Sequence, residues 1–434
     1  MDRNVLRDNG QAVFDTAMAS ARNFAIASQT RWRIPLALAV SIFFNYLTRN
    51  NLALALPRIA DEFGWSDRAV GSNGEVLLGV FFISYGLSNA VLSPLAERLG
   101  AKASTAIAIA TFSILTLLFA PLGISFGALV ILRLLLGLAQ GVHIPMMSAI
   151  ISQWFPLKER SRANTLWGLG MILEVAISPL LVIGLIERFS WRPAFAILGV
   201  ASLVLALPLT IWLVQDRPRQ SLSGRDDVAP LFSPVSERSN IGWSDLVANG
   251  RFWLAVVGGS LNNFCTFGIL GWLPIYFNRA KGVDFEALGW PLTLVFAIGI
   301  LGTVTMAVVG DWLGKRSLLA AVGCAIAGIL IYIATQMQSI SLLVLCFAGA
   351  VFFQSAYRAQ EYAIIQRLLP SQRVGAGTGL YNGLAVFIGG VGGSFVPGSI
   401  VASTGSFDAG MVSIVAGAWL GAITMVGLHR LVKY

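Results

Sequence analysis

The chain has 434 residues, of which 56% are hydrophobic and only 12% are charged, whereas about a quarter of the residues in an ordinary soluble domain carry a charge. This composition excludes a water-soluble globular protein. The formal net charge is +9, but the basic residues lie between apolar runs, where membrane topology explains them better than nucleic-acid binding does. Cys265, Cys324 and Cys346 lie inside apolar runs without metal-ligand spacing, so no disulfide framework or metal site is predicted.

The hydropathy pattern predicts a tail, six membrane spans, a polar linker and six more spans. Residues 1–32 mix acidic and basic side chains, which does not fit a cleavable signal sequence and indicates a cytoplasmic tail. Residues 33–214 and 251–434 contain apolar runs that are long enough to cross a bilayer as helices, and the linker at 215–250 separates them. We therefore expect an all-α membrane protein with 12 transmembrane helices. The expected spans are 33–57, 73–96, 103–122, 125–153, 163–186, 192–214, 252–278, 286–309, 317–336, 339–366, 375–402 and 409–429.

Most of the 30 Lys and Arg residues fall in the tail, the linker and the loops on one side of these spans. Because cytoplasmic loops are enriched in basic residues, both termini are predicted to face the cytoplasm. We expect a monomer in the bilayer of a bacterial inner (plasma) membrane.

An internal repeat divides the chain into two halves. Glu97 and Asp311 lie in the loops after the second and eighth spans, and they are 214 positions apart, as are Pro156 and Pro370 in two later loops. Short basic loops of this kind, in two parallel units of six helices, resemble the major facilitator superfamily. The resemblance implies two halves that rock about a central site near the bilayer midplane. It also implies that loop charges close the cytoplasmic side, and the candidates are Glu97, Arg98, Lys102, Asp311, Lys315 and Arg316.

Three arginines lie within predicted spans, although an arginine at the centre of a membrane helix costs roughly 2.5 to 3.5 kcal/mol. Arg49 shares a helix face with Asn45, four residues earlier. It is predicted to bind an anion in a central cavity, and the alternative is that its side chain extends to the outer interface. Arg133 shares a face with Gln140. Arg133 is expected either to bind substrate or to pair with an acid on a neighbouring span.

Buried acids are candidates for proton coupling. Glu174 on the fifth span shares its helix with no basic residue in the apolar run, so it is expected either to pair with Arg133 or to take a proton, because burial disfavours the charged form. Glu361 on the tenth span is aligned with Arg358, which predicts either a structural ion pair or a switch that opens for an anion. His143 is a further candidate proton carrier, although a structural role is the alternative.

The second half also offers polar residues for a bound solute. Asn263 and Thr266 on the seventh span are expected to face Arg49. The full set of candidate substrate-binding residues is Asn45, Arg49, Arg133, Gln140, Asn263, Thr266, Tyr357, Arg358 and Asn382.

Two branches of the family resemble this chain most. The segment Asn45-Tyr-Leu-Thr48-Arg49 is similar to the first span of the organophosphate:phosphate antiporters, which implies that Arg49 binds an anion. Arg133 and the loop at 154–160 resemble the anion:cation symporters, which implies a sugar acid or another carboxylate. The second phosphate-binding arginine of the first branch is Thr266 here, and the acids of the second branch are Thr48 and Gln140. This leaves Glu174, Glu361 or no proton coupling.

The predicted function is secondary active transport of a small organic anion, with protons or a counter-anion as the coupling partner. The alternatives are export of amphipathic drugs or lipids and sensing of a solute. No cofactor and no nucleic-acid partner are expected. An enzyme is not indicated, because no nucleophile and base occur in a recognisable arrangement.

Overall fold

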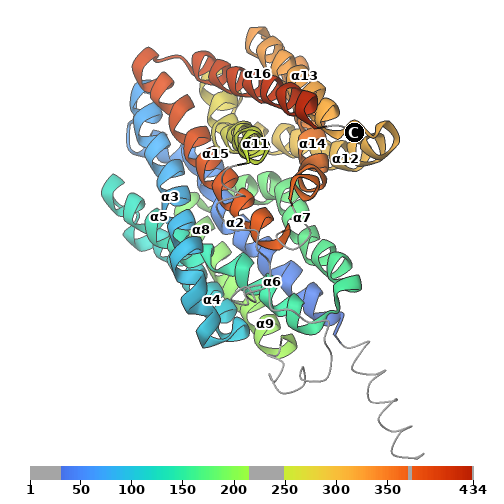
Figure 1. The fold of residues 1–434 in the computed structure, drawn as a ribbon. Coiled ribbons are helices and arrows are strands. Elements are labelled where there is room, and N and C mark those ends of the chain that lie inside the picture. Colours follow the sequence, from blue (N-terminus) through green and yellow to red (C-terminus); the bar gives the residue numbers. More distant parts are fainter. Residues whose placement is uncertain (1–30, 215–248, 370–373, 433–434) are drawn as a thin grey trace, which may run out of the picture.

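A computed structural model describes residues 31–214, 249–369 and 374–432. Nearly all of the predicted tail and linker, and Pro370, therefore lie outside the described residues. The described chain is helical throughout, and Figure 1 shows its first half (blue to green) beside its second half (yellow to red). The first half consists of α2 (Arg33–Glu62), α3 (Asp67–Leu99), α4 (Ala101–Leu122), α5 (Phe126–Gly141), α6 (His143–Trp154), α7 (Leu157–Phe189), α8 (Trp191–Ala201), η1 (Ser202–Ala206) and α9 (Leu207–Leu213).

The second half repeats this order of helices. It consists of α11 (Gly250–Ile275), η3 (Tyr276–Ala280), η4 (Phe285–Leu288), α12 (Gly289–Leu313), α13 (Arg316–Gln336), α14 (Ile340–Leu368), α15 (Val374–Thr404) and α16 (Phe407–Leu431). Helices α5 and α6 together make one span, as do α8, η1 and α9. We refer to residues up to 214 as the N half and to residues from 249 as the C half.

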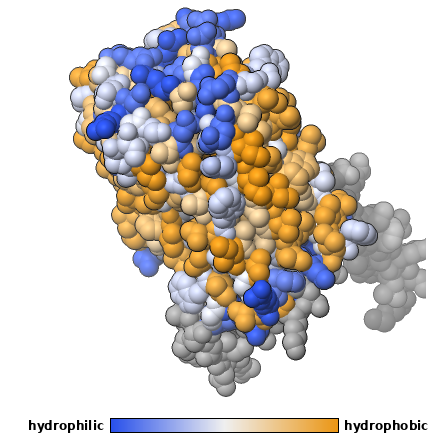
Figure 2. Space-filling model, turned by 90° about the horizontal axis from the view of Figure 1, so that it is seen from above, coloured by the Kyte–Doolittle hydropathy of each residue, from blue (hydrophilic) through white to orange (hydrophobic). Residues whose placement is uncertain are grey.

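Eleven helices or helix series within the described residues are long and apolar enough to cross a membrane. Helix α2 has the length, with 30 residues, but Asn45, Arg49, Asn50 and Asn51 interrupt its apolar sequence. Counting α2 gives the 12 helices that the sequence predicts. On the face seen in Figure 2, hydrophobic residues form a broad belt and hydrophilic residues gather toward opposite ends, as expected for a protein surrounded by lipid.

Local signals set several of the helix ends. The hydroxyl of Ser66 accepts a hydrogen bond from the backbone N–H of Ala69 at the start of α3, and Ser406 does the same at the start of α16. Gly314 follows α12 with a φ of +67°, a left-handed conformation that glycine adopts without steric cost. These residues explain why short turns can join long helices here.

The two halves contact each other through α3 with α15, α2 with α11 and α7 with α12, and Figure 1 shows α15 running beside α3. The backbones of α3 and α15 approach closely at Gly71, where an added Cβ would lie 2.4 Å from the backbone nitrogen of Ala402. At α12, an added Cβ on Gly289 would lie 3.2 Å from the Leu180 side chain of α7. Small residues thus allow the helices of the two halves to touch.

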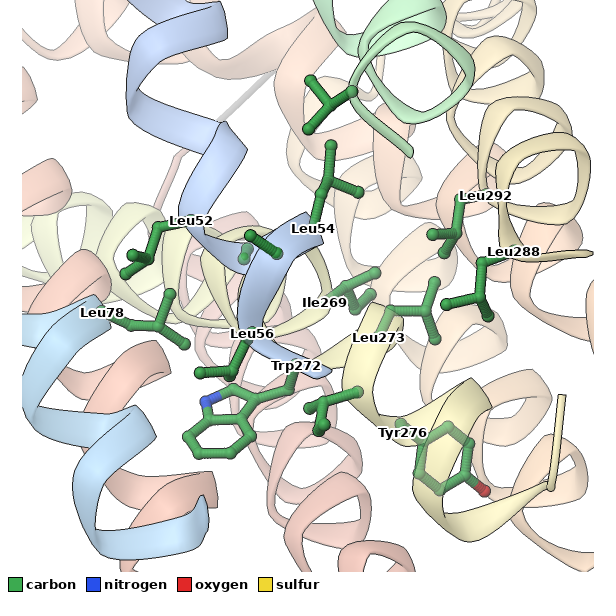
Figure 3. Close-up of a cluster of buried hydrophobic side chains, with 14 of the residues drawn as sticks. Leu52, Leu54, Leu56, Leu78, Ile269, Trp272, Leu273, Tyr276, Leu288 and Leu292 are labelled. Carbon is green, nitrogen blue, oxygen red and sulfur yellow. The ribbon is translucent and has the colours of Figure 1, made fainter. Parts of the chain in front are cut away.

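Apolar side chains fill the contact between α2 and α11. Figure 3 shows Leu54 and Leu56 of α2 near Ile269 and Trp272 of α11, and all four are buried in one core cluster. Leu56 and Trp272 both lie against Gly74 of α3. The halves therefore share a continuous hydrophobic core at this level.

Polar contacts join the halves at the helix ends near Asp61 and Asp67, which we call the sealed side. Arg279, just after α11, donates to Asp61 of α2 at 2.5 Å and lies 3.7 Å from Asp67 of α3. The Ser399 hydroxyl of α15 donates to Glu75 of α3 at 2.6 Å. Sequence reasoning did not single out these residues.

The opposite end is called the terminal side because Arg31 and Leu431 lie there. Two ion pairs on this side each join residues of one half. Arg31 pairs with Glu159 at 2.7 Å in the N half, and Arg316 pairs with Asp311 at 2.6 Å in the C half. Of the other predicted gating residues, Glu97, Arg98 and Lys315 are exposed and Lys102 is half-buried. In this conformation, Asp311 and Arg316 form an ion pair within the C half and not with a residue of the N half.

The close approach at Gly71 predicts that a larger side chain there opens the sealed side. Gly71→Val should shift the protein away from this conformation, because overpacking a tight contact costs about 1 to 3 kcal/mol. Disulfide cross-linking of Glu75→Cys with Ser399→Cys should fall several-fold in this background. Gly127→Val is the control, because an added Cβ at Gly127 meets nothing within 4 Å. Equal cross-linking in both variants would contradict the assignment of Gly71 to a closing contact.

Candidate functional site

Arg49 lies in the middle of α2, and aromatic rings surround its guanidinium. Its Cζ is between 4.8 and 5.2 Å from the centroids of five rings, and we call this set the aromatic cage. The cage consists of Tyr46, Phe81, Phe82, Tyr85 and Phe267. Phe267 alone comes from the C half, and its ring is 4.6 Å from that of Phe82. The cage therefore closes where the two halves meet.

Arg49 is buried without a counter-ion. Only 5% of the residue is exposed, its Nη2 has no hydrogen-bond partner, and no described carboxylate lies within ion-pair distance of it. A guanidinium over an aromatic face gains about 0.5 to 2 kcal/mol, and the rings thus compensate part of the cost of burial. An arginine that extends to the outer interface, the alternative expected from the sequence, is not observed.

A small cavity adjoins Arg49 between the halves. Its lining includes Arg49 and Arg133 from the N half and Phe267 and Ser394 from the C half, and its volume is about 30 Å³. A water molecule needs about 10 to 15 Å³, so this cavity has room for water but not for an organic acid. A larger ligand requires the halves to separate here.

Arg133 connects α5 to two other helices. Its Nε donates to the carbonyl oxygen of Leu77 on α3 and its Nη1 donates to that of Arg49 on α2, both at 3.0 Å. The expected partner Glu174 is not within ion-pair distance. Arg133 therefore stabilises the arrangement of α2, α3 and α5, and its charge also borders the small cavity.

Glu174 on α7 is fully buried and pairs with a neutral group. The Asn50 side chain of α2 donates to its Oε2 at 3.0 Å. The expected pairing with Arg133 is wrong, because the guanidinium of Arg133 is directed to backbone carbonyls of α2 and α3 instead. Among the described residues, Glu174 is thus a carboxylate without an ion-pair partner, and proton uptake by Glu174 stays a prediction.

Gln140 makes a bridge that recurs in the C half. Its Nε2 donates to the carbonyl oxygen of Asn45 at 3.1 Å and to the hydroxyl of Thr48 at 3.0 Å. Gln354, 214 positions later, donates in the same way to the carbonyl of Asn262 and to the hydroxyl of Thr266, both at 3.1 Å. We call these the glutamine bridges. The repeat thus extends to a pair of uncharged contacts, α5 with α2 and α14 with α11.

Arg358 and Glu361 do not form the expected ion pair. The carboxylate of Glu361 accepts a hydrogen bond from the Tyr381 hydroxyl of α15 at 2.9 Å, and this hydroxyl lies 3.1 Å from that of Tyr357. Arg358 is exposed, and its Nη2 donates to Thr266 at 3.4 Å. Glu361 is buried whereas Arg358 is exposed, and Tyr381, which the sequence did not reveal, holds the acid.

The remaining candidates lie in different surroundings. His143 is fully buried, and its Nε2 is 2.7 Å from the Ser41 hydroxyl within the N half, which favours the structural alternative. Tyr357 is buried in the core of the C half. Asn263 packs against Gly389 of α15, and Asn382 is exposed near Tyr362.

Comparison with known proteins decides the family. Residues 38–394 match the family model described as the Major Facilitator Superfamily. The chain belongs to this family. It is accordingly a membrane transporter and not an enzyme, and the two six-helix halves are the fold that the sequence predicts.

Similar proteins support this assignment. The chain is 25% identical to the "Probable L-galactonate transporter" of Escherichia coli, over 92% of this chain and 90% of that protein. It is also 25% identical to the "Probable galactarate/D-glucarate transporter GudP" of Bacillus subtilis, over 90% of each. Among solved structures, a bacterial homologue of the human lysosomal transporter Spinster in an inward-facing, unoccupied conformation superposes with a TM-score of 0.72. The superposition covers 92% of this chain and 94% of the other chain, and the two sequences are 18% identical. This likeness therefore concerns the fold alone.

The glutamine bridges predict matched effects in the two halves. Gln140→Ala and Gln354→Ala should each lower the melting temperature of the purified protein by a similar few degrees, because each removes two hydrogen bonds of about 1 kcal/mol apiece. Gln336→Ala, at an exposed position, is the control. A loss of stability in one half alone would show that the two bridges are not equivalent.

Proposed function

We propose that this protein moves a small organic anion, a carboxylate, across the membrane by alternating access, with Arg49 as the anion-binding group. The observation that supports this proposal is a guanidinium without a counter-ion at the contact between two halves. Similar proteins are named as transporters of galactonate, galactarate or glucarate, and hexuronate. These substrates share a carboxylate on a polyhydroxylated chain, which is the chemistry that we assign to the passenger.

A carboxylate can compete with the aromatic cage for Arg49. Arginine and a carboxylate form paired hydrogen bonds that match in geometry, and a hydrogen bond to a charged group contributes about 1.5 to 3 kcal/mol. Each single cation–π contact with a ring contributes less, at about 0.5 to 2 kcal/mol. The cage therefore holds the guanidinium in the absence of an anion and can release it when one arrives.

The contacts between the halves support alternating access. With both termini in the cytoplasm, as the loop charges predict, the sealed side faces outward and this conformation opens inward. Opening of the sealed side breaks the ion pair of Arg279 with Asp61 and the contact of Phe82 with Phe267. Because Phe267 contacts Arg49 as well, the release of the cage and the separation of the halves are one event.

Proton symport through Glu174 is the coupling that we favour over anion exchange. Glu174 is buried and bonds to the neutral Asn50, which follows Arg49 on α2 and lines the same small cavity. A proton on Glu174 removes a negative charge near the anion site and so favours binding of the anion. Glu361, bonded to Tyr381, is the second candidate. The setting is a bacterial inner membrane, and the protein acts as a monomer.

Removal of the guanidinium tests the anion site. Arg49→Gln should abolish uptake of galactonate and galactarate into proteoliposomes, while the purified protein still elutes as a single folded species. Arg49→Lys should retain a small fraction of the activity, since an ammonium keeps the charge but loses the paired hydrogen bonds. Arg188→Gln, which removes an exposed charge, should leave uptake unchanged. Undiminished uptake by Arg49→Gln would refute the role of Arg49.

Replacement of the buried carboxylate tests the coupling. Glu174→Gln keeps the hydrogen-bonding shape but cannot exchange a proton, so accumulation driven by an inward proton gradient should be lost. Exchange of labelled for unlabelled substrate should persist. Glu187→Gln, at an exposed position, serves as the matched control. Proton-driven accumulation that survives in Glu174→Gln would exclude this residue as the coupling site.

A further inference from the structure

We infer that Arg358 is a second anion-binding group, contributed by the C half, and that the passenger is a sugar diacid with one carboxylate for each half. This inference rests on the proposed function and deepens it. It concerns a different helix, α14, and a guanidinium that differs from Arg49 in being exposed.

Arg358 is a cation whose binding capacity is largely unused. Its one hydrogen bond among the described residues is the long contact from Nη2 to the hydroxyl of Thr266, at 3.4 Å. No described carboxylate lies within ion-pair distance of it. An arginine carries several N–H donors in a planar fork that fits a carboxylate, so most of this fork remains available to a ligand.

The acid nearest in sequence does not form an ion pair with Arg358. Glu361 is nine-tenths buried and accepts its hydrogen bond from Tyr381, and Tyr381 in turn contacts Tyr357 in the core of the C half. This carboxylate is thus held by the hydroxyl of Tyr381 on the buried side of α14. The guanidinium of Arg358 is left toward the exposed side.

Neighbouring contacts place Arg358 at the space between the halves. Thr266 belongs to α11, which packs against α2 of the N half. Phe267, the residue after Thr266 on α11, is a member of the cage, and its ring centroid lies 5.2 Å from the Cζ of Arg49. The two arginines therefore border one region from opposite halves.

Thr266 fixes the position of Arg358. Its hydroxyl donates to the carbonyl of Asn262 at 3.0 Å and accepts from both Gln354 and Arg358. A hydroxyl has one proton and two lone pairs, so Thr266 is fully used and cannot bind a substrate as well. The glutamine bridge of the C half thereby orients an arginine, whereas the equivalent bridge of the N half contacts only α2.

Two uncompensated guanidiniums on two moving bodies favour a passenger with an acid at each end. A monoacid can neutralise only one of them and leaves the other without a partner. A diacid can bind both, and a ligand that contacts both halves stabilises the conformation in which they close around it. The second carboxylate is thus the group that distinguishes substrates here.

Galactarate and galactonate are a matched pair of probes, because they differ in having a carboxylate or a hydroxymethyl group at one end. We expect the purified full-length protein to bind galactarate about tenfold or more tightly than galactonate, since charge-assisted hydrogen bonds contribute about 1.5 to 3 kcal/mol. The measurement is the dissociation constant of each acid by calorimetry. In Arg358→Gln the preference for galactarate should vanish. The dissociation constant of galactonate should stay within about threefold of its value in the unmodified protein. Arg49→Gln should weaken the binding of both galactarate and galactonate.

Arg367→Gln is the control, because it removes an exposed charge on the same helix and should keep the preference. Equal binding of the two acids by the unmodified protein, or a preference that persists in Arg358→Gln, would overturn the diacid inference and leave organic anion transport standing. Binding of neither acid would contradict the proposed function itself and this inference with it.

Discussion

The structure depends on a positive charge that has been buried without a negative partner. Arg49 lies in the middle of a membrane helix, where its desolvation is costly, and its surroundings offer aromatic faces rather than a carboxylate. A permanent ion pair would remove the affinity for an external anion. The cage makes the burial tolerable and keeps the site unsatisfied, since Nη2 has no hydrogen-bond partner.

The same interface explains how binding and movement are linked. Small residues at Gly71 and Gly289 let helices of the two halves approach closely, and Arg279 adds an ion pair at the rim with Asp61. One ring of the cage, Phe267, belongs to the opposite half from Arg49. A movement of the Arg49 guanidinium therefore changes a contact between the halves directly, because Phe267 touches it.

The two halves are related by duplication but differ where charge is concerned. Their glutamine bridges use the same residue types and contacts, and such neutral hydrogen bonds do not change with pH. The acids, Glu174 and Glu361, are bonded to an amide and to a phenol. The glutamine bridges are thus built from groups that do not titrate, whereas Glu174 and Glu361 are bonded to neutral groups that can bond either state of the acid.

The sequence by itself determined the spans, the repeat and the family. An apolar run of about 20 residues has few alternatives to a membrane helix, so helices α2 to α16 lie within a few residues of their predicted ranges. It also identified the polar positions on each span, because the period of a helix fixes which residues share a face. The tertiary structure alone decided their partners. Arg133 binds backbone carbonyls rather than Glu174, and Tyr381 rather than Arg358 holds Glu361. Such choices depend on how each helix is rotated against its neighbours, and packing of the whole molecule sets that rotation.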